Sequence, residues 1–375
     1  MVNKKYDIIV HGATGFTGKL ICNYIYEHEE SSSINWAISG KNQKRLDVIA
    51  QKYKVDSFKA NSFDKESLNL IAKEAKLIIS VVGPYAIYGK KIIESCVENH
   101  CHYLDLTGEP DFVYFVEKNF SQKAEKNNII LMNCCGFESI PPDLGVYYTI
   151  NQLKTNNAKI NTFLKTKGKI SGGTWASFLN SFTSSKPIIK KELDKDRKAR
   201  KLFYMKDLKK WALIFPVIDK HIVKKSSKNI GYGEAFSFNE YILFNSIFKV
   251  IVLITSISLI SILAKFSFFR AWLKSFVPSG QGPNKQERSN HWFELKIFGK
   301  TKSENIVTTV SGGDPGYGET SKFISEMALC IILNYNQLDC NKGVITPAQC
   351  SGDLMIERLK KTGIKFEHQI KKRRS

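Results

Sequence analysis

Near its start this 375-residue chain reads YDIIVHGATGFTG, from Tyr6 to Gly18, and the rest of the sequence is organised around this stretch. Residues 6–10 are mostly apolar and β-branched, which predicts a buried strand. Three glycines then fall at three-residue spacing, and residues 19–27 carry an apolar stripe at helical spacing. Strand, glycine turn and helix in this order favour dinucleotide binding, because bare backbone can approach a pyrophosphate and the amides that open the helix attract it. The alternative is a tight turn that only packs against a neighbouring helix.

Strand-like and helical segments alternate six times over the first 140 residues or so. The strands are expected at 6–10, 34–40, 57–60, 77–82, 103–106 and 129–134. This alternation predicts an α/β fold with a doubly wound parallel sheet of the Rossmann type. In such a sheet the ligand crevice lies at the carboxyl ends of the strands.

The end of the second strand bears on the choice of cofactor. An acidic residue there would bind the ribose 2′-hydroxyl of NAD, but this strand ends in SGKN at 39–42, with Arg45 one turn later. Lys41 suits a 2′-phosphate, so we expect NADP (NADPH) rather than NAD. The alternative is that Lys41 is simply a solvated loop lysine.

The residues expected to bind the cofactor lie in the glycine turn and at two later strand ends. They are Gly12, Ala13, Thr14, Gly15, Phe16, Thr17, Gly18, Gly40, Lys41, Arg45, Val82, Gly83 and Pro84.

Charge is distributed unevenly along the chain, whose net charge is +21. Residues 1–150 are close to neutral, with a net charge of −1, so the whole excess lies in the remainder. A basic second half favours an anionic partner such as phospholipid headgroups or a phosphorylated carrier. The basic run 186–228 lacks an interleaved aromatic ladder, so no nucleic-acid partner is expected.

The stretch 241–264 is conspicuously apolar and carries one charge, Lys249. As a single helix its 24 residues would be about 36 Å long, enough for a bilayer. Three interpretations remain open: an interfacial helix or re-entrant hairpin, a buried core or dimer helix, and a true span. The aromatic and charged residues up to 277 and the basic tail would help on an anionic surface.

We divide the chain at residues 150 and 340. Residues 1–150 form the NAD(P)-binding domain, residues 151–340 an α+β substrate or dimerisation domain, and residues 341–375 a C-terminal helix that returns to the first domain, with a basic tail. The eight cysteines show no C-x-x-C spacing and no accompanying histidine cluster, which disfavours a zinc site. A reducing, cytosolic setting is expected.

A series of motifs along nearly the whole chain resembles the saccharopine dehydrogenase-like oxidoreductases. They are GATGFTG at 12–18, VGPYAIYG at 82–89, YLDLTGE at 103–109, GFESIPPDLG at 136–145, SGGT at 171–174, DPGY at 314–317 and GVITPA at 343–348. The resemblance implies a Rossmann domain, a second α+β domain inserted before a returning segment, and a nicotinamide cofactor. Animal members of this family are associated with lipid droplets and membranes, and bacterial trans-acting enoyl reductases act in the assembly of complex lipids.

Two functions compete. The first is an NADPH-dependent reductase of a lipid or acyl substrate on the cytoplasmic side of a membrane or lipid droplet, with Tyr85 or Tyr88 as proton donor. Asp105 and Glu109 are further titratable candidates at a strand end. The second is a membrane-tethered NADP-binding scaffold or sensor without turnover, and a homodimer fits either function. Saccharopine metabolism is a third and weaker alternative.

Overall fold

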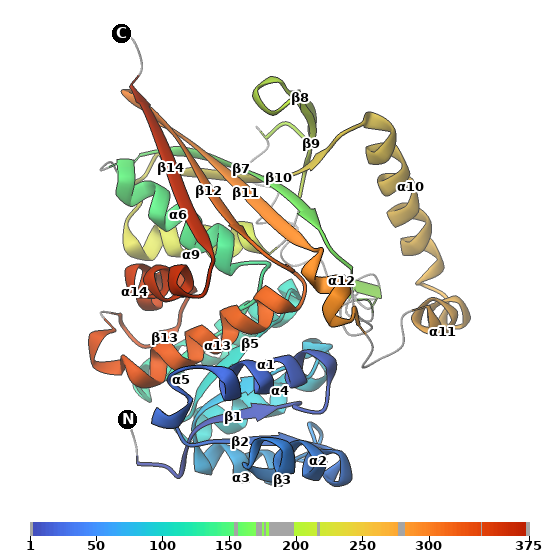
Figure 1. Cartoon of the computed structure of the whole chain (residues 1–375), viewed down its shortest axis with the longest axis vertical. Helices are drawn as coiled ribbons and strands as arrows, with labels where there is room; N and C mark the ends of the chain where they lie inside the picture. The colour runs from blue at the N-terminus through green and yellow to red at the C-terminus, as the bar shows by residue number, and fades with distance from the viewer. Residues whose placement is uncertain are drawn as a thin grey trace. The chain divides into compact units, whose positions relative to one another are not determined.

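The computed structural model describes residues 3–153, 157–169, 175, 178–179, 199–215, 218–276, 282–338 and 340–372. The chain divides into two compact units, drawn in Figure 1. The first comprises residues 1–137 and 316–358, and the second comprises residues 138–315 and 359–375. The SGGT motif at 171–174, part of the basic run and the last three residues lie outside the described residues.

The first unit contains a parallel seven-stranded sheet with the order β13-β6-β5-β4-β1-β2-β3. The strands are β1 (Tyr6–His11), β2 (Trp36–Gly40), β3 (Asp56–Lys59), β4 (Ala75–Ser80), β5 (His102–Asp105), β6 (Ile130–Met132) and β13 (Gly343–Val344). The strand order reverses between β1 and β4, which is where the ligand crevice of such a sheet opens. The predicted doubly wound α/β fold is confirmed.

Helices cover both faces of this sheet, which explains why its central strands are almost wholly apolar. They are α1 (Phe16–Glu27), α2 (Gln43–Tyr53), α3 (Lys65–Glu74), α4 (Tyr85–Glu98), α5 (Pro110–Lys126) and α13 (Gly318–Leu333), with short 3₁₀ turns η1 (Ser31–Ser33) and η3 (Tyr335–Gln337). Helix α13 packs against α1 and β4, while α3, α4 and α5 pack side by side (Figure 1).

The chain returns to the first unit earlier than the sequence indicated. We expected the return at 341, but it begins at 316, because α13 is buried on nearly all sides beside the first sheet. Residues after 341 do return to the first unit, where β13 pairs with β6. Helix α14 (Pro347–Lys361) comes next, and then β14 (Lys365–Lys372) joins the sheet of the second unit. The segment 341–375 therefore serves both units.

The second unit contains a mixed seven-stranded sheet with the order β14-β12-β11-β7-β10-β9-β8. Its other strands are β7 (Lys159–Lys167), β8 (Leu202–Met205), β9 (Lys210–Ile214), β10 (Ser237–Phe244), β11 (Trp292–Lys300) and β12 (Glu304–Gly312). Helices α6 (Ile140–Leu153) and α9 (Asp219–Ile230) pack on one face of this sheet. A 3₁₀ turn, η2 (Lys206–Leu208), joins β8 to β9, and the short helix α12 (Lys285–Ser289) precedes β11.

Helix α6 also explains why the first boundary lies at 137 and not at 150. A Cβ at Gly145 would lie 2.5 Å from Ile297 Cδ1 and 3.0 Å from Val310 Cγ2, so α6 lies tightly on β11 and β12 of the second sheet.

The apolar stretch 241–264 is not one helix. Its first four residues belong to β10, where Tyr241 is paired with Phe163 of β7. The Ser246 side chain then caps α10 (Ile247–Leu263), and α11 (Ser267–Ser275) comes after it. Of α10 only Val250 is buried, which argues against a helix buried in the core of this unit. None of the described helices combines the length and the apolarity that crossing a membrane requires.

Candidate dinucleotide-binding site

The turn after β1 has a backbone that only glycine fits. Gly12 has φ +95°, in the left-handed region, and a Cβ there would lie 2.7 Å from Val82 Cγ2. A Cβ at Gly18 would overlap the carbonyl oxygen of Gly12. The N–H groups of Gly12 and Ala13 donate to Ser39 O at 2.8 and 3.2 Å, which ties the turn to the end of β2.

Helix α1 begins directly after this turn and presents its N-terminus to it. Gly15 is the N-cap and, as a glycine, supplies no side-chain capping bond. The first intrahelical bond runs from Lys19 N to Gly15 O at 3.0 Å, so the amides of the first turn, including those of Thr17 and Gly18, open toward the loop. Bare backbone and a helix N-terminus at the point where strand order reverses fit a diphosphate. The ring of Phe16 packs edge-on against Tyr317 of the DPGY motif, with centroids 5.0 Å apart.

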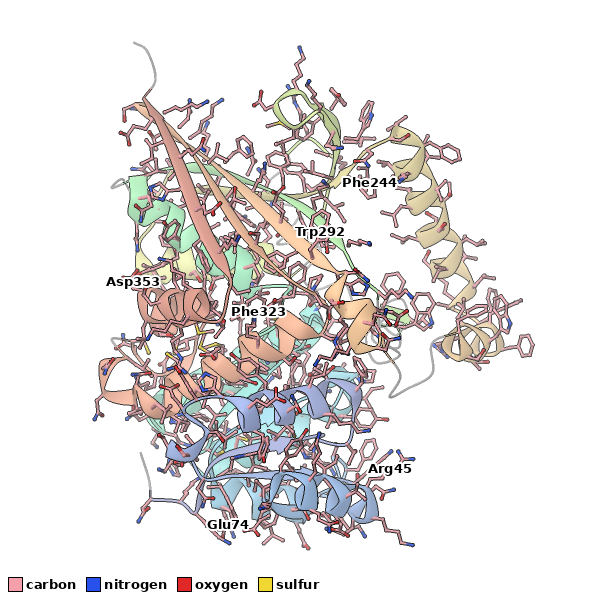
Figure 2. All side chains as sticks on the ribbon, in the orientation of Figure 1. Arg45, Glu74, Phe244, Trp292, Phe323 and Asp353 are labelled. Carbon is pink, nitrogen blue, oxygen red and sulfur yellow. The ribbon has the colours of Figure 1, made fainter. Side chains whose placement is uncertain are left out.

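The end of β2 lies beside the turn, as expected for the adenosine side of the crevice. A Cβ at Gly40 would lie 3.9 Å from Thr14 Oγ1. Lys41 is exposed, and so is Arg45, which projects from α2 (Figure 2). The Asn42 side chain caps α2 by accepting from Arg45 N at 3.1 Å. The carboxylate typical of NAD sites is missing from positions 39–45, so the expectation of NADP stays a prediction.

Val82 lies on the opposite side of the turn, and Gly83 and Pro84 follow it in the chain. Val81 N donates to His11 O at 3.0 Å, which holds this segment against β1. The Gly83–Pro84 peptide bond is cis, and Pro84 is the N-cap of α4. The structure thus brings together the predicted cofactor residues from three separate parts of the first unit.

The hydroxyl of Tyr85 is bonded to two backbone groups. Its side chain is 6% exposed, and its hydroxyl donates to Ser80 O at 3.2 Å and accepts from Leu106 N at 3.3 Å. The hydroxyl braces the ends of β4 and β5, so we correct the catalytic expectation for Tyr85. Glu109 also has a structural task, because its two carboxylate oxygens accept from Tyr85 N and Ala86 N, each at 2.9 Å, and so cap α4.

Tyr88 remains a candidate proton donor. It is half-buried one turn into α4, with its ring edge-on to exposed Phe63 at 5.2 Å.

Asp105 lies fully buried at the end of β5. Its Oδ1 accepts from Thr107 N at 3.0 Å and Cys134 N at 3.2 Å, and its Oδ2 accepts from Asn133 Nδ2 at 2.6 Å. Burial raises the pKa of Asp105 to about 7, although these donors oppose the shift. The pKa of this carboxyl is thus close to neutral pH, and the carboxyl lies at the edge of the sheet that faces the ligand crevice.

A row of buried polar residues was missed by the sequence analysis. Ser39, His11 and Ser80 are register neighbours at the ends of β2, β1 and β4, and all are at most 1% exposed. His11 Nδ1 lies 3.0 Å from Ser39 Oγ, and burial lowers the pKa of His11 to about 4, which keeps the ring neutral. The sequence signal that could have identified this row is a polar residue at the end of an otherwise apolar strand.

Fold and site together define a dinucleotide-binding α/β protein with a second, mixed-sheet unit. The family model of the saccharopine dehydrogenase NADP-binding domain matches residues 8–132. A saccharopine dehydrogenase-like oxidoreductase of Mus musculus is 27% identical, and a lipid droplet localized protein of Caenorhabditis elegans is 25% identical. These alignments cover 97% of this chain and 97% and 98% of those proteins.

The solved structures agree with this fold. Apo saccharopine dehydrogenase of Saccharomyces cerevisiae matches with a TM-score of 0.56 over 98% of this chain and 100% of that one, at 12% identity. Over nearly its whole length the chain is thus similar to saccharopine dehydrogenase-like oxidoreductases.

Proposed function

We propose that this protein is an NADP-dependent reductase that acts on a lipid or acyl-type substrate at a membrane or lipid-droplet surface. The observation that supports the cofactor assignment is the glycine turn at the reversal of strand order, with Lys41 at the end of β2 and no carboxylate beside it. A cation at this position stabilises a 2′-phosphate that an acidic residue would repel.

Each part of the site has a task in this proposal. The bound cofactor would supply a hydride. The amides around Gly12 and Gly18 hold its diphosphate, and Lys41 and Arg45 neutralise its 2′-phosphate. Tyr88 donates a hydrogen bond or a proton to the oxygen on which charge develops.

The surface of α10 and α11 supports a lipid setting. Both helices and the two cap residues of α11 expose large apolar side chains, among them Phe248, Ile251, Ile254, Leu259, Ile262, Phe266, Phe268, Trp272 and Phe276. Lys249, Lys265 and Arg270 are interspersed, a pattern that suits a headgroup layer. In addition, one relative is named for its location on lipid droplets. We therefore infer a peripheral attachment through these helices.

A scaffold without turnover is the second candidate. It is favoured by one observation: Tyr85 and Glu109, two of the sequence-based candidates for proton transfer, are engaged in bracing and capping.

Titration with NADPH and NADH, followed by fluorescence, tests the cofactor assignment. The unmodified protein should bind NADPH more tightly, and Lys41→Asp should lose at least about tenfold in affinity for NADPH with little change for NADH, since about 1.4 kcal/mol corresponds to a factor of ten. Lys44→Asp, the same charge change at an exposed position on α2, is the control. Equal affinity for both cofactors would remove the phosphate argument. NADPH oxidation with acyl substrates then separates the enzyme from the scaffold.

A further inference from the structure

The second unit contains a hollow at one end of its sheet that the proposed site does not use. Its volume is about 420 Å³, and it lies where β7 and β12 end and β11 and β14 begin. We call it the β11–β12 pocket and define it by Lys165, Trp292, Glu294, Ser311, Gly313 and Lys365. All of these residues belong to the second unit.

Strand register explains how four polar side chains meet there. Lys165 pairs with Glu294, Glu294 with Ser311, and Ser311 with Lys365, so one cross-strand row runs over β7, β11, β12 and β14. The alternate residues Leu164, Phe293 and Val310 are buried. The row therefore lies on the sheet face opposite α6 and α9, with a lysine at each end, about 14 Å apart across three inter-strand spacings.

The charges in this row leave the pocket positive. The only acidic member, Glu294, already lies 3.8 Å from Lys296 on its own strand. Among the described residues, neither Lys165 nor Lys365 forms an ion pair. Lys165 Nζ lies 5.1 Å from the centroid of the Trp292 ring, which positions the ammonium beside the hollow.

Trp292 gives the pocket an apolar wall. It is the first residue of β11, is labelled in Figure 2, and remains 36% exposed. Just before it, His291 Nδ1 lies 2.7 Å from Asp314 Oδ1, and both side chains are buried. This bond ties the start of β11 to the loop after β12, so Trp292 and Gly313 are held on one frame. Two cations around a rigid, partly aromatic hollow suit an organic phosphate better than a free ion.

We propose that the β11–β12 pocket binds a phosphate-bearing ligand, with the phosphate between Lys165 and Lys365 and the organic part on Trp292. The phosphate could come from a lipid headgroup or from the carrier arm of an acyl group. We take this ligand to be the substrate, and that part of the proposal rests on the proposed function. The binding of an organic phosphate to the pocket does not depend on it.

Isothermal titration calorimetry on the full chain tests the pocket. The probes are dihexanoyl phosphatidic acid, coenzyme A and inorganic phosphate, added with NADPH at saturation so that the cofactor site is filled. Lys165→Glu with Lys365→Glu should weaken binding of the organic phosphates at least about tenfold. Trp292→Ala should weaken the two organic probes and leave inorganic phosphate unchanged. Whichever organic probe binds more tightly identifies the source of the phosphate.

A matched control separates the pocket from net charge. Lys159 and Lys371 lie on the same two strands and the same sheet face, six residues from Lys165 and Lys365, or about 20 Å along the strands. Lys159→Glu with Lys371→Glu should change the affinity less than twofold. Equal weakening by the two double variants, or no binding by the unmodified protein up to about 10 mM, would overturn the pocket. If the pocket fails while NADPH still binds, the proposed function stands; if NADPH fails to bind, the proposed function falls and the pocket is tested without it.

Discussion

Gly12 shows how strongly one residue constrains the cofactor turn. Its φ of +95° strains any side chain, and a Cβ would also press on Val82 at 2.7 Å. Gly363 has φ +93°, and no atom of the described residues lies within 4 Å of such a Cβ. A side chain would therefore strain the backbone at both positions, but only at Gly12 would it also collide with a neighbouring side chain.

We expect Gly12→Ala to lower the free energy of unfolding by about 2–4 kcal/mol, from strain and overpacking together, and to weaken NADPH binding at least about tenfold. Gly363→Ala should cost only about 1–2 kcal/mol, because it adds strain alone, and should leave NADPH binding unchanged. Urea unfolding and fluorescence titration measure both. Normal NADPH affinity in Gly12→Ala would show that the turn does not hold the diphosphate.

The pKa of Asp105 predicts how the stability of the protein changes with pH. Its pKa in the folded protein is about 7, above the ordinary value of 3.8, because burial disfavours the carboxylate. Between these values the folded protein retains a proton that the unfolded chain releases, so this group's contribution to stability falls as pH rises from about 4 to about 7. Asp105→Asn cannot ionise, and therefore the Tm of the variant relative to the unmodified protein should increase from pH 5 to pH 8.

Thermal unfolding at several pH values checks this expectation, with Asp207→Asn at an exposed position as the control. The amide of the variant can find an acceptor, since the buried Asn133 Oδ1 has no hydrogen-bond partner among the described residues. Parallel Tm curves for Asp105→Asn and the unmodified protein would mean that the carboxyl is ionised across the whole range.

At the scale of elements, α10 and α11 expose apolar residues that no described part of the chain covers. Ile251, Leu259 and Phe268 are 52%, 58% and 77% exposed. Replacing all three by Ser should abolish co-flotation with anionic vesicles and leave the Tm within about 2 °C, because exposed side chains contribute little to folding. Val48→Ser with Leu70→Ser, at exposed apolar positions of the first unit, should leave flotation unchanged.

The alternatives for this segment give different results in the same experiment. A lower sedimentation coefficient of the triple variant would indicate that the helices form a dimer interface. A large fall in Tm would indicate that they are part of a core.

Features of the fold and the site that depend on local interactions could be predicted from the sequence, and features that depend on distant or backbone partners could not. The strands of the first 140 residues follow local periodicity: the strand predicted at 6–10 is β1, Tyr6–His11, and the strand predicted at 103–106 is β5, His102–Asp105. Residues 241–244 were misassigned to a helix, because an apolar run does not show that Tyr241 pairs with Phe163. The hydroxyl of Tyr85 was misjudged for a similar reason: its partners, Ser80 O and Leu106 N, are backbone atoms without a sequence signal.

At the scale of the whole chain, the first unit is completed by residues 316–358, which lie between the two parts of the second unit in the sequence. A buried polar cluster helps to hold this returning segment. Glu326 on α13 is 1% exposed; it accepts from Tyr24 Oη at 2.5 Å and Arg358 Nε at 2.8 Å, and lies 2.9 Å from His28 Nε2. Arg358 also pairs with Glu30. The cluster thus joins α1 and the turn after it to α13 and α14, through hydrogen bonds that span 302 and 328 residues of sequence.

Arg358→Ala should lower the free energy of unfolding by about 3–5 kcal/mol, because it leaves the Glu326 carboxylate buried without its strongest partner. Adding Glu326→Gln should recover part of that loss, since the neutral amide costs less to bury. Urea unfolding of the two single variants and the double variant forms a thermodynamic cycle for the pair. If Arg358→Ala costs no more than the roughly 1 kcal/mol of an exposed ion pair, and Glu326→Gln recovers nothing, then apolar packing of α13 alone retains the returning segment.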